Sequence, residues 1–349
     1  MWQVVGQDKA VSLLQHSLET GTLAHAYLFV GPPHVGKMTL ALNLAQALNC
    51  QSVERPCGEC VSCQKIVSAN HADVQVVGLT QNDSSAEAKL RTEIGIDQIR
   101  QLQHSASLPP FEGDYRVFII EGAELLSIEA ANCLLKTLEE PGDRVVFILL
   151  TTDIGLFPAT VTSRCQRLEL TPLAAARMEA VLNSHWNIEP ARAGLLSRLS
   201  HGCLGWALSA ASDNSLLQQR EEEMDRLLGI IRADYDERFT FVARLATHFS
   251  QNRGPVYDML NLWLDYWRDL LLVKTGCHDI IINIDLLSAL VETARGYTLS
   301  QIKDFIESLR LTGEHLRQNA NPQLVLEVLM LDIPRKEGGV REIPLPGYW

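Results

Sequence analysis

The sequence predicts an α/β domain built on a parallel sheet, followed by a region made of helices alone. Up to about residue 171, short apolar runs of strand type alternate with stretches whose apolar residues recur at helical spacing. Beyond that point the strand pattern fades, and helical periodicity continues to about residue 335. Strands that are separated by helices pair in parallel, with the helices on the faces of the sheet.

The expected elements of the first region alternate along the chain. Strands are expected at residues 26–31, 73–78, 116–120, 144–152 and 166–170. Helices are expected at 7–19, 37–48, 128–140 and around Ile96, Ile99 and Leu102. Ser127 can cap the helix at 128–140, and Pro141 follows its end. An acidic, serine-containing loop is expected to end near residue 92.

Domain boundaries are expected near residues 171 and 212. They give an α/β domain at 1–171 with an insert at 50–63, a small helical domain at 172–211, a larger helical domain at 212–335 and a tail at 336–349. The tail is rich in proline and glycine, which indicates an arm or disorder. We expect at least two of Trp263, Tyr266 and Trp267 to lie in the core, because large aromatic side chains are mostly buried.

Composition limits the classes of protein to be considered. The chain has 349 residues, 46% of them hydrophobic, and a net charge of -12, so a contact with DNA would need a local basic patch or a partner. No apolar run approaches the ~18 residues of a membrane helix, and the N-terminus has no signal-peptide pattern. We therefore expect a cytoplasmic protein, in which the eight cysteines are thiols or metal ligands rather than disulfides.

The segment GPPHVGKMT, residues 31–39, departs at one position from the phosphate-binding pattern G-x-x-x-x-G-K-[ST]. Its glycines let backbone N–H groups surround phosphate oxygens, and the helix that follows adds positive potential. Lys37 would reach the terminal phosphates. Met38 stands where the pattern has a hydroxyl for magnesium. Thr39 cannot simply replace it, because successive helical side chains point about 100° apart.

The strand VFIIEGAE ends in an incomplete acidic pair. In an active site of this type one acid organises magnesium and a second polarises the attacking water. Glu121 occupies the first position and Gly122 the second, while Glu124 lies two residues further and need not point inward. An alternative is that Glu121 is only a solvated strand end. Either way, the group that would activate water is expected to be absent.

Four cysteines lie within CQSVERPCGECVSC. Cys50, Cys57, Cys60 and Cys63 form two overlapping C-x-x-C units plus one more thiol, which can supply a closed, structural site of four sulfurs. Four unligated thiols and a redox C-x-x-C are the alternatives, and the fourth cysteine argues against the redox motif. The scattered cysteines are expected to be small buried residues: Cys133, Cys165, Cys203 and Cys277.

Taken in order, the motifs resemble the bacterial DNA polymerase III clamp loader, an AAA+ assembly. The motifs are VVGQ (4–7), AHAYLF (24–29), the loop at 31–39, the cysteine insert, LLKTLEEPG (134–142), FILLTT (147–152) and TSRC (162–165). The resemblance covers at least residues 4–211. It implies an AAA+ nucleotide-binding domain, a helical lid, and a C-terminal collar that holds a five-subunit ring together.

The resemblance also implies ligands and partners. Zinc is implied at the four cysteines, and the partners would be the delta and gamma/tau subunits, with the sliding clamp and primer-template DNA contacted through the complex. The implied nucleotide site comprises Val4, Val5, Gly31, His34, Val35, Gly36, Lys37, Met38, Thr39, Glu121 and Thr152.

Two kinds of subunit in that family share these motifs. The gamma or tau motor hydrolyses ATP, whereas delta prime keeps the fold without hydrolysis. The motor would have threonine at position 38, aspartate at 121, glutamate at 122, and an arginine within the lid stretch GCLGWAL (202–208), where this chain has Gly205. These departures favour a delta-prime-like subunit in which binding of ATP or ADP is weak or dispensable.

Arg164 lies in the TSRC motif. From the sequence alone it is equally well a surface arginine paired with a nearby acid. In the family this motif carries the arginine that reaches the ATP of a neighbouring subunit, so the resemblance implies a catalytic role in trans. Two other functions stay open. One is an active motor subunit. The other is a DNA-binding module with the insert as its finger, which the scarcity of basic residues there disfavours.

Overall fold

The computed structural model describes residues 2–79 and 93–335. The loop expected at 80–92 and the tail expected at 336–349 lie outside these residues. The chain divides into two compact units, Met1–Met178 with Ser200–Leu208, and Glu179–Leu199 with Ser209–Trp349. The three-domain division expected from the sequence stays a prediction. Among the described residues, no helix combines the length and apolar character that crossing a membrane requires.

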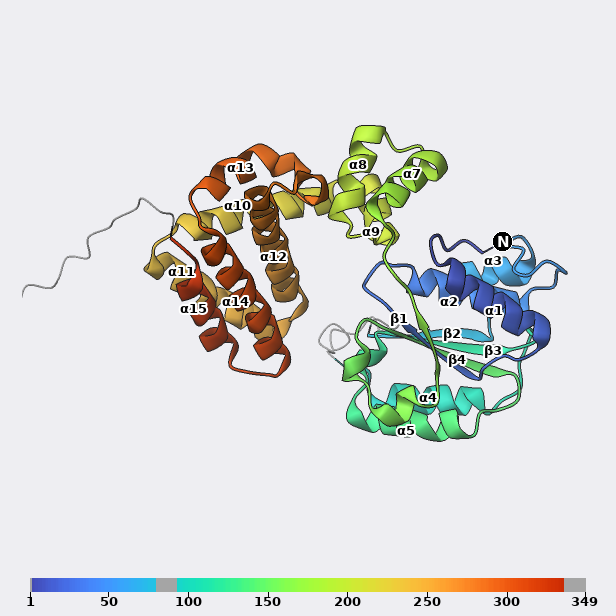
Figure 1. Cartoon of the computed structure of the whole chain (residues 1–349). Helices are drawn as coiled ribbons and strands as arrows, with labels where there is room; N and C mark the ends of the chain where they lie inside the picture. The colour runs from blue at the N-terminus through green and yellow to red at the C-terminus, as the bar shows by residue number, and fades with distance from the viewer. Residues whose placement is uncertain (1, 80–92, 336–349) are drawn as a thin grey trace, which may run out of the picture. The chain divides into compact units, whose positions relative to one another are not determined.

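The first unit is built on a parallel sheet, which confirms the predicted fold class. Its five strands are hydrogen-bonded in the order β2-β3-β4-β1-β5 (Figure 1). Their bounds are β1 Ala26–Val30, β2 Val74–Val77, β3 Arg116–Glu121, β4 Val145–Thr151 and β5 Gln166–Glu169. Each lies within or against a stretch that the apolar pattern predicted.

Helices cover both faces of this sheet (Figure 1). Successive strand residues enter opposite cores, so that Tyr27 packs with α1 and α2, whereas Leu28 packs with α4 and α5. The bounds in this part of the chain are α1 Asp8–Thr20, α2 Lys37–Asn49, α3 Val61–Val67, α4 Ile96–Ala106, η2 Ala123–Leu125, α5 Ile128–Glu139, η3 Ile154–Leu156 and α6 Ala159–Thr162. The predicted cap is confirmed, because the Ser127 hydroxyl accepts the Ala130 N–H at 3.1 Å.

The strand register brings the functional segments to one edge of the sheet. Val30, the last residue of β1, lies opposite Thr151 of β4 on one side and Glu169 of β5 on the other. Glu121, the last residue of β3, lies opposite Leu150 of β4. The carboxyl ends of parallel strands meet at the same edge, where α/β proteins place their ligands. The loop after β1 and the acids after β3 therefore share one site.

In the described residues after β5, up to residue 335, the regular elements are all helices, as the periodicity predicted. The first three along the sequence are α7 Ala175–Trp186, α8 Pro190–Leu199 and α9 Leu204–Ser212. The bundle contains α10 Ser215–Arg232, α11 Tyr235–Gln251, α12 Gly254–Thr275, η4 His278–Ile280, η5 Ile284–Leu286, α13 Leu287–Arg295, α14 Leu299–Arg317 and α15 Pro322–Asp332.

Helix α12 is the centre of this bundle and packs against α10, α11, α13 and α14. Its three large aromatic residues, Trp263, Tyr266 and Trp267, are all buried, which confirms their predicted place in the core. The Trp267 ring lies 4.7 Å from the Phe305 ring and 5.2 Å from the Tyr297 ring, measured between centroids.

A buried arginine joins three helices of the bundle. Arg238 of α11 is 6% exposed. It donates hydrogen bonds to Ile230 O and Ile231 O near the end of α10 and to Met330 O near the end of α15. Carbonyl groups at helix ends lack some of their partners within the helix, so a cation there adds hydrogen bonds to acceptors that are shielded from water. Ile230 O also accepts the Ala233 N–H.

Replacement of Trp267 by alanine should destabilise the helical bundle severely. Removal of a fully buried tryptophan leaves a cavity and costs about 3–5 kcal/mol. The matched control is Trp186→Ala, since the Trp186 side chain is 40% exposed and its loss should cost much less. Urea unfolding followed by circular dichroism measures both free energies. Equal losses in the two variants would contradict the placement of Trp267 at the centre of the core.

Candidate functional site

A pocket of about 410 Å³ lies at the carboxyl edge of the sheet in the first unit. It is lined by Pro33, His34, Gly36, Lys37, Met38, Thr39, Glu121, Gly122, Glu124, Leu150, Thr151, Thr152 and Gly205. Most of the predicted nucleotide-site residues are therefore together, while Val4, Val5, Gly31 and Val35 are not part of the lining. Val4 lies just behind it, because a Cβ at Gly36 would be 3.3 Å from Val4 Cγ2.

In the phosphate loop, residues 31–39, main-chain carbonyl groups accept hydrogen bonds from the lysine of the same loop. Lys37 Nζ donates to Gly31 O at 2.5 Å and to Pro32 O at 2.8 Å. Burial lowers the pKa of Lys37, and Glu124, Cys203 and Glu121 oppose this by favouring its charged form. The ammonium therefore has two of its three donors engaged by the loop itself.

The position of the missing hydroxyl is apolar. Met38 is half-buried and packs against the core between α2 and the sheet, whereas Thr39 is exposed. Both line the pocket. The Thr39 hydroxyl nevertheless does not take the place of a hydroxyl at position 38, because successive helical side chains point about 100° apart. The structure thus retains the loop and its lysine while the usual hydroxyl ligand for magnesium is absent from position 38.

The acids after β3 are arranged differently from what the sequence suggested. Glu121 is exposed at the strand end, and Gly122 has φ 64°, a left-handed conformation that glycine adopts freely. Glu124 does point into the pocket. Its Oε1 accepts the Thr152 hydroxyl at 2.7 Å and the Thr152 N–H at 3.2 Å. Its Oε2 is buried and has no hydrogen-bond partner within the described ranges.

Glu124 and Gly205 line the pocket although neither is among the nucleotide-site residues predicted from the sequence. The turn Ala123–Leu125 redirects the chain after β3 and brings Glu124 inward. Gly205, which stands where the motor subunits have an arginine, contacts the phosphate loop directly. Neither contact has a local sequence signal, because each joins segments far apart along the chain.

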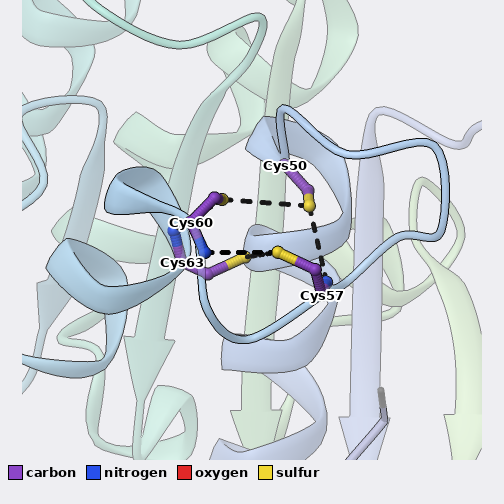
Figure 2. Close-up of side chains that lie close together, drawn as sticks. All are labelled: Cys50, Cys57, Cys60 and Cys63. Carbon is purple, nitrogen blue, oxygen red and sulfur yellow. Dashed lines mark hydrogen bonds between the residues drawn. The ribbon is translucent and has the colours of Figure 1, made fainter.

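The four predicted metal ligands form one cluster (Figure 2). All four Sγ atoms lie within 4.8 Å of one another. The Sγ atoms of Cys50 and Cys60 are 4.0 Å apart, and those of Cys57 and Cys63 are 3.9 Å apart. Four sulfurs at about 2.3 Å from a tetrahedral zinc would be separated by about 3.8 Å. The cluster therefore fits a closed four-sulfur site.

Backbone N–H groups already point at these sulfurs. Cys50 Sγ accepts from the N–H groups of Ser52 and Cys57, and Cys57 Sγ accepts from the Cys60 N–H at 3.3 Å. Hydrogen bonds from the backbone of Cys60 and Glu59 lower the pKa of Cys57 to about 6, whereas burial raises the pKa of Cys63 to about 12. A bound dication would deprotonate all four thiols.

The other cysteines are less uniform than predicted. Cys203 is buried and Cys133 and Cys165 are half-buried, but the prediction of a buried Cys277 is wrong, since this residue is exposed. Cys277 follows Gly276, the left-handed residue that ends α12, so it lies in the turn beyond the packed face of the helix.

Arg164 is not among the residues that line the pocket. It follows α6 on the surface, where its Nη2 lies 2.7 Å from Glu139 Oε1 and its Nη1 donates to Thr160 O at 2.9 Å. Its side chain is 35% exposed and that of Glu139 is 50% exposed. The arginine therefore contacts a nearby acid in the isolated chain, and its predicted role in trans stays a prediction.

Comparison with known proteins identifies the family. The family model described as "DNA polymerase III, delta subunit" matches residues 6–174. The chain is 28% identical to the DNA polymerase III subunit delta' of Bacillus subtilis over 93% of this chain and 95% of that protein. It is 26% identical to subunit tau of the same organism over 95% of this chain and 60% of that protein. The chain belongs to the DNA polymerase III clamp-loader family.

A further curated relative and a solved structure are also similar to this chain. Subunit tau of Escherichia coli is 36% identical over 59% of this chain and 31% of tau. A solved gamma subunit-related protein from Thermotoga maritima aligns over 92% of this chain and 98% of its own length, with 16% identity and a TM-score of 0.43. The chain spans about three fifths of the Bacillus tau subunit and almost all of its delta'. Family membership therefore leaves the two kinds of subunit to be distinguished by the site.

Purified protein should contain about one zinc ion per chain, held by the four clustered cysteines. Cys57→Ser should lower zinc content well below one, because three thiolates bind a structural zinc more weakly than four. Cys277→Ser is the control, since this exposed cysteine lies outside the cluster and its loss should leave the metal in place. Elemental analysis after dialysis without chelators measures both. Zinc-free wild-type protein would refute the assignment.

Proposed function

We propose that the chain is a delta-prime-like clamp-loader subunit that does not hydrolyse ATP and that supplies Arg164 to the ATP site of a neighbouring subunit. In this role it helps to load the sliding clamp onto primed DNA, as part of a five-subunit ring with delta and gamma/tau subunits in the bacterial cytoplasm. Residues 172–211 would be the lid and residues 212–335 the collar. Zinc would be structural.

The second acidic position carries the argument against hydrolysis. Gly122 occupies it, and the nearby carboxylate of Glu124 is held by Thr152 through one oxygen. A general base must reach the water that it activates, and a carboxylate bonded to the pocket wall is poorly placed for that. Met38 further removes the magnesium hydroxyl. The loop retains Lys37, so weak binding of ATP or ADP is compatible with the proposal.

The setting of Arg164 suits a role in trans. The guanidinium is on the surface, outside the pocket of its own chain. Its ion pair with Glu139 is half-exposed, and such pairs contribute only about 0–1 kcal/mol. A phosphate group of the ATP bound to a neighbouring subunit could displace Glu139 at little cost in free energy. It would then accept two parallel hydrogen bonds from the guanidinium.

One observation favours the alternative of an active motor subunit. Glu124 Oε2 is buried and unpaired within the described part of the chain, so it could bond a water or a metal-bound ligand in the pocket. Steady-state turnover of the purified chain separates the two functions. ATP hydrolysis that is abolished by Glu124→Gln would support the motor, and its absence in wild-type protein supports the delta-prime-like role.

Arg164→Ala should lower the DNA-stimulated ATPase rate and clamp loading of the reconstituted complex, while folding, zinc content and assembly are unchanged. An arginine supplied in trans contributes about 10³–10⁵ in rate in other phosphoryl-transfer enzymes. The overall loss should be smaller, because other interfaces in the ring keep their arginines. Arg167→Ala is the matched control, since Arg167 is an exposed arginine that pairs with Glu169. Normal turnover in an intact Arg164→Ala ring would refute the role.

Lys37→Ala should leave clamp loading by the assembled complex largely intact. In a motor subunit the same substitution removes the contact to the terminal phosphates, whereas here it removes only hydrogen bonds to the loop's own carbonyls. The corresponding lysine substitution in the gamma/tau subunit is the positive control and should abolish loading. A severe defect from Lys37→Ala in a folded, assembled subunit would indicate a working nucleotide site.

A further inference from the structure

A main-chain hydrogen bond joins the first turn of α9 to the phosphate loop. The Gly205 N–H donates to His34 O at 2.9 Å. Both residues belong to the first unit and both line the pocket. The first N–H groups of a helix have no partner within the helix, and in the first turn of α9 the loop satisfies one of them. In nucleotide-binding proteins such groups are free to bind phosphate.

The contact leaves no room for a side chain at position 205. A Cβ there would lie 2.9 Å from His34 O and 3.3 Å from His34 Cβ. His34 O belongs to the backbone, so the clash could be relieved only if the loop and α9 moved apart. Any residue other than glycine, the arginine of the lid pattern included, would therefore separate the two segments.

Two side-chain donors of the pocket are also bonded to the protein. Lys37 donates to carbonyls of its own loop, and the Thr152 hydroxyl donates to Glu124. Together with the Gly205–His34 contact, these bonds engage three donors that line the pocket. A nucleotide would have to replace several of them at once.

We infer that Gly205 fixes the first turn of α9 against the phosphate loop in the absence of nucleotide, and that this contact closes the pocket to the phosphates of a nucleoside di- or triphosphate. The inference rests on the proposed function only in treating the pocket as a former nucleotide site. It assigns Gly205 a positive role as the residue that excludes nucleotide. The position of Ser200–Leu208 would then not depend on ATP.

The test combines hydrogen exchange with ADP binding on the full, zinc-containing chain. In wild-type protein the amides of residues 204–206 should be protected, and ADP should leave exchange at residues 33–37 unchanged. Gly205→Ala should speed exchange in both segments by about fivefold or more, the factor expected for one lost backbone hydrogen bond. It should also raise ADP affinity at least about tenfold. The reason is that a phosphate loop separated from α9, the conformation that would bind ADP, is then no longer a minor state.

The matched control is Gly229→Ala in α10, where an added Cβ would meet no atom within 4 Å. Alanine at a free helical position should leave exchange at residues 33–37 and ADP binding as in wild-type protein. Fast exchange of the Gly205 amide in wild-type protein, or ADP protection of residues 33–37 there, would overturn the inference even if Gly205→Ala fails to fold. Neither result depends on turnover, so ATP hydrolysis by the chain would contradict the proposed function separately.

Discussion

The first unit depends on the pairing of β1 with β4 and β5. Residues 26–29 of β1 are fully buried, and their side chains alternate between the two cores that hold the helices on either face. The strand also fixes where the phosphate loop begins, since Gly31 N–H donates to Thr151 O at 3.2 Å. A shift of one residue in this register would exchange the two faces of β1 and would move Lys37 away from Glu121 and Glu124.

Patterns of local origin could be predicted from the sequence. The strands were recognisable because a parallel sheet buries both faces and so gives continuous apolar runs. The four cysteines were recognisable because their ligand spacing is contained in fourteen residues, Cys50 to Cys63. The burial of Trp263, Tyr266 and Trp267 followed from their size alone.

Contacts between distant segments could not be predicted in the same way. Glu124 enters the pocket because of a tight turn, and its partner Thr152 is 28 residues away. Arg164, which follows α6, pairs with Glu139 at the end of α5. Gly205 in the first turn of α9 donates a hydrogen bond to His34 in the loop after β1. Cys277 is exposed although cysteine is usually buried, because it lies just beyond the end of α12. In each case tertiary geometry, rather than residue preference, determines the result.

The buried guanidinium of Arg238 affects the order in which the protein can form during synthesis. Its three acceptors come from both ends of the bundle sequence, Ile230 and Ile231 early and Met330 near the last helix. Until α15 has left the ribosome, the Met330 acceptor is missing and α11 lacks the side chains of α15 that pack against it. Domains fold in order from the N-terminus as they emerge. The sheet unit, apart from Ser200–Leu208, can therefore mature first, whereas the bundle closes only when nearly all of the described chain has been made.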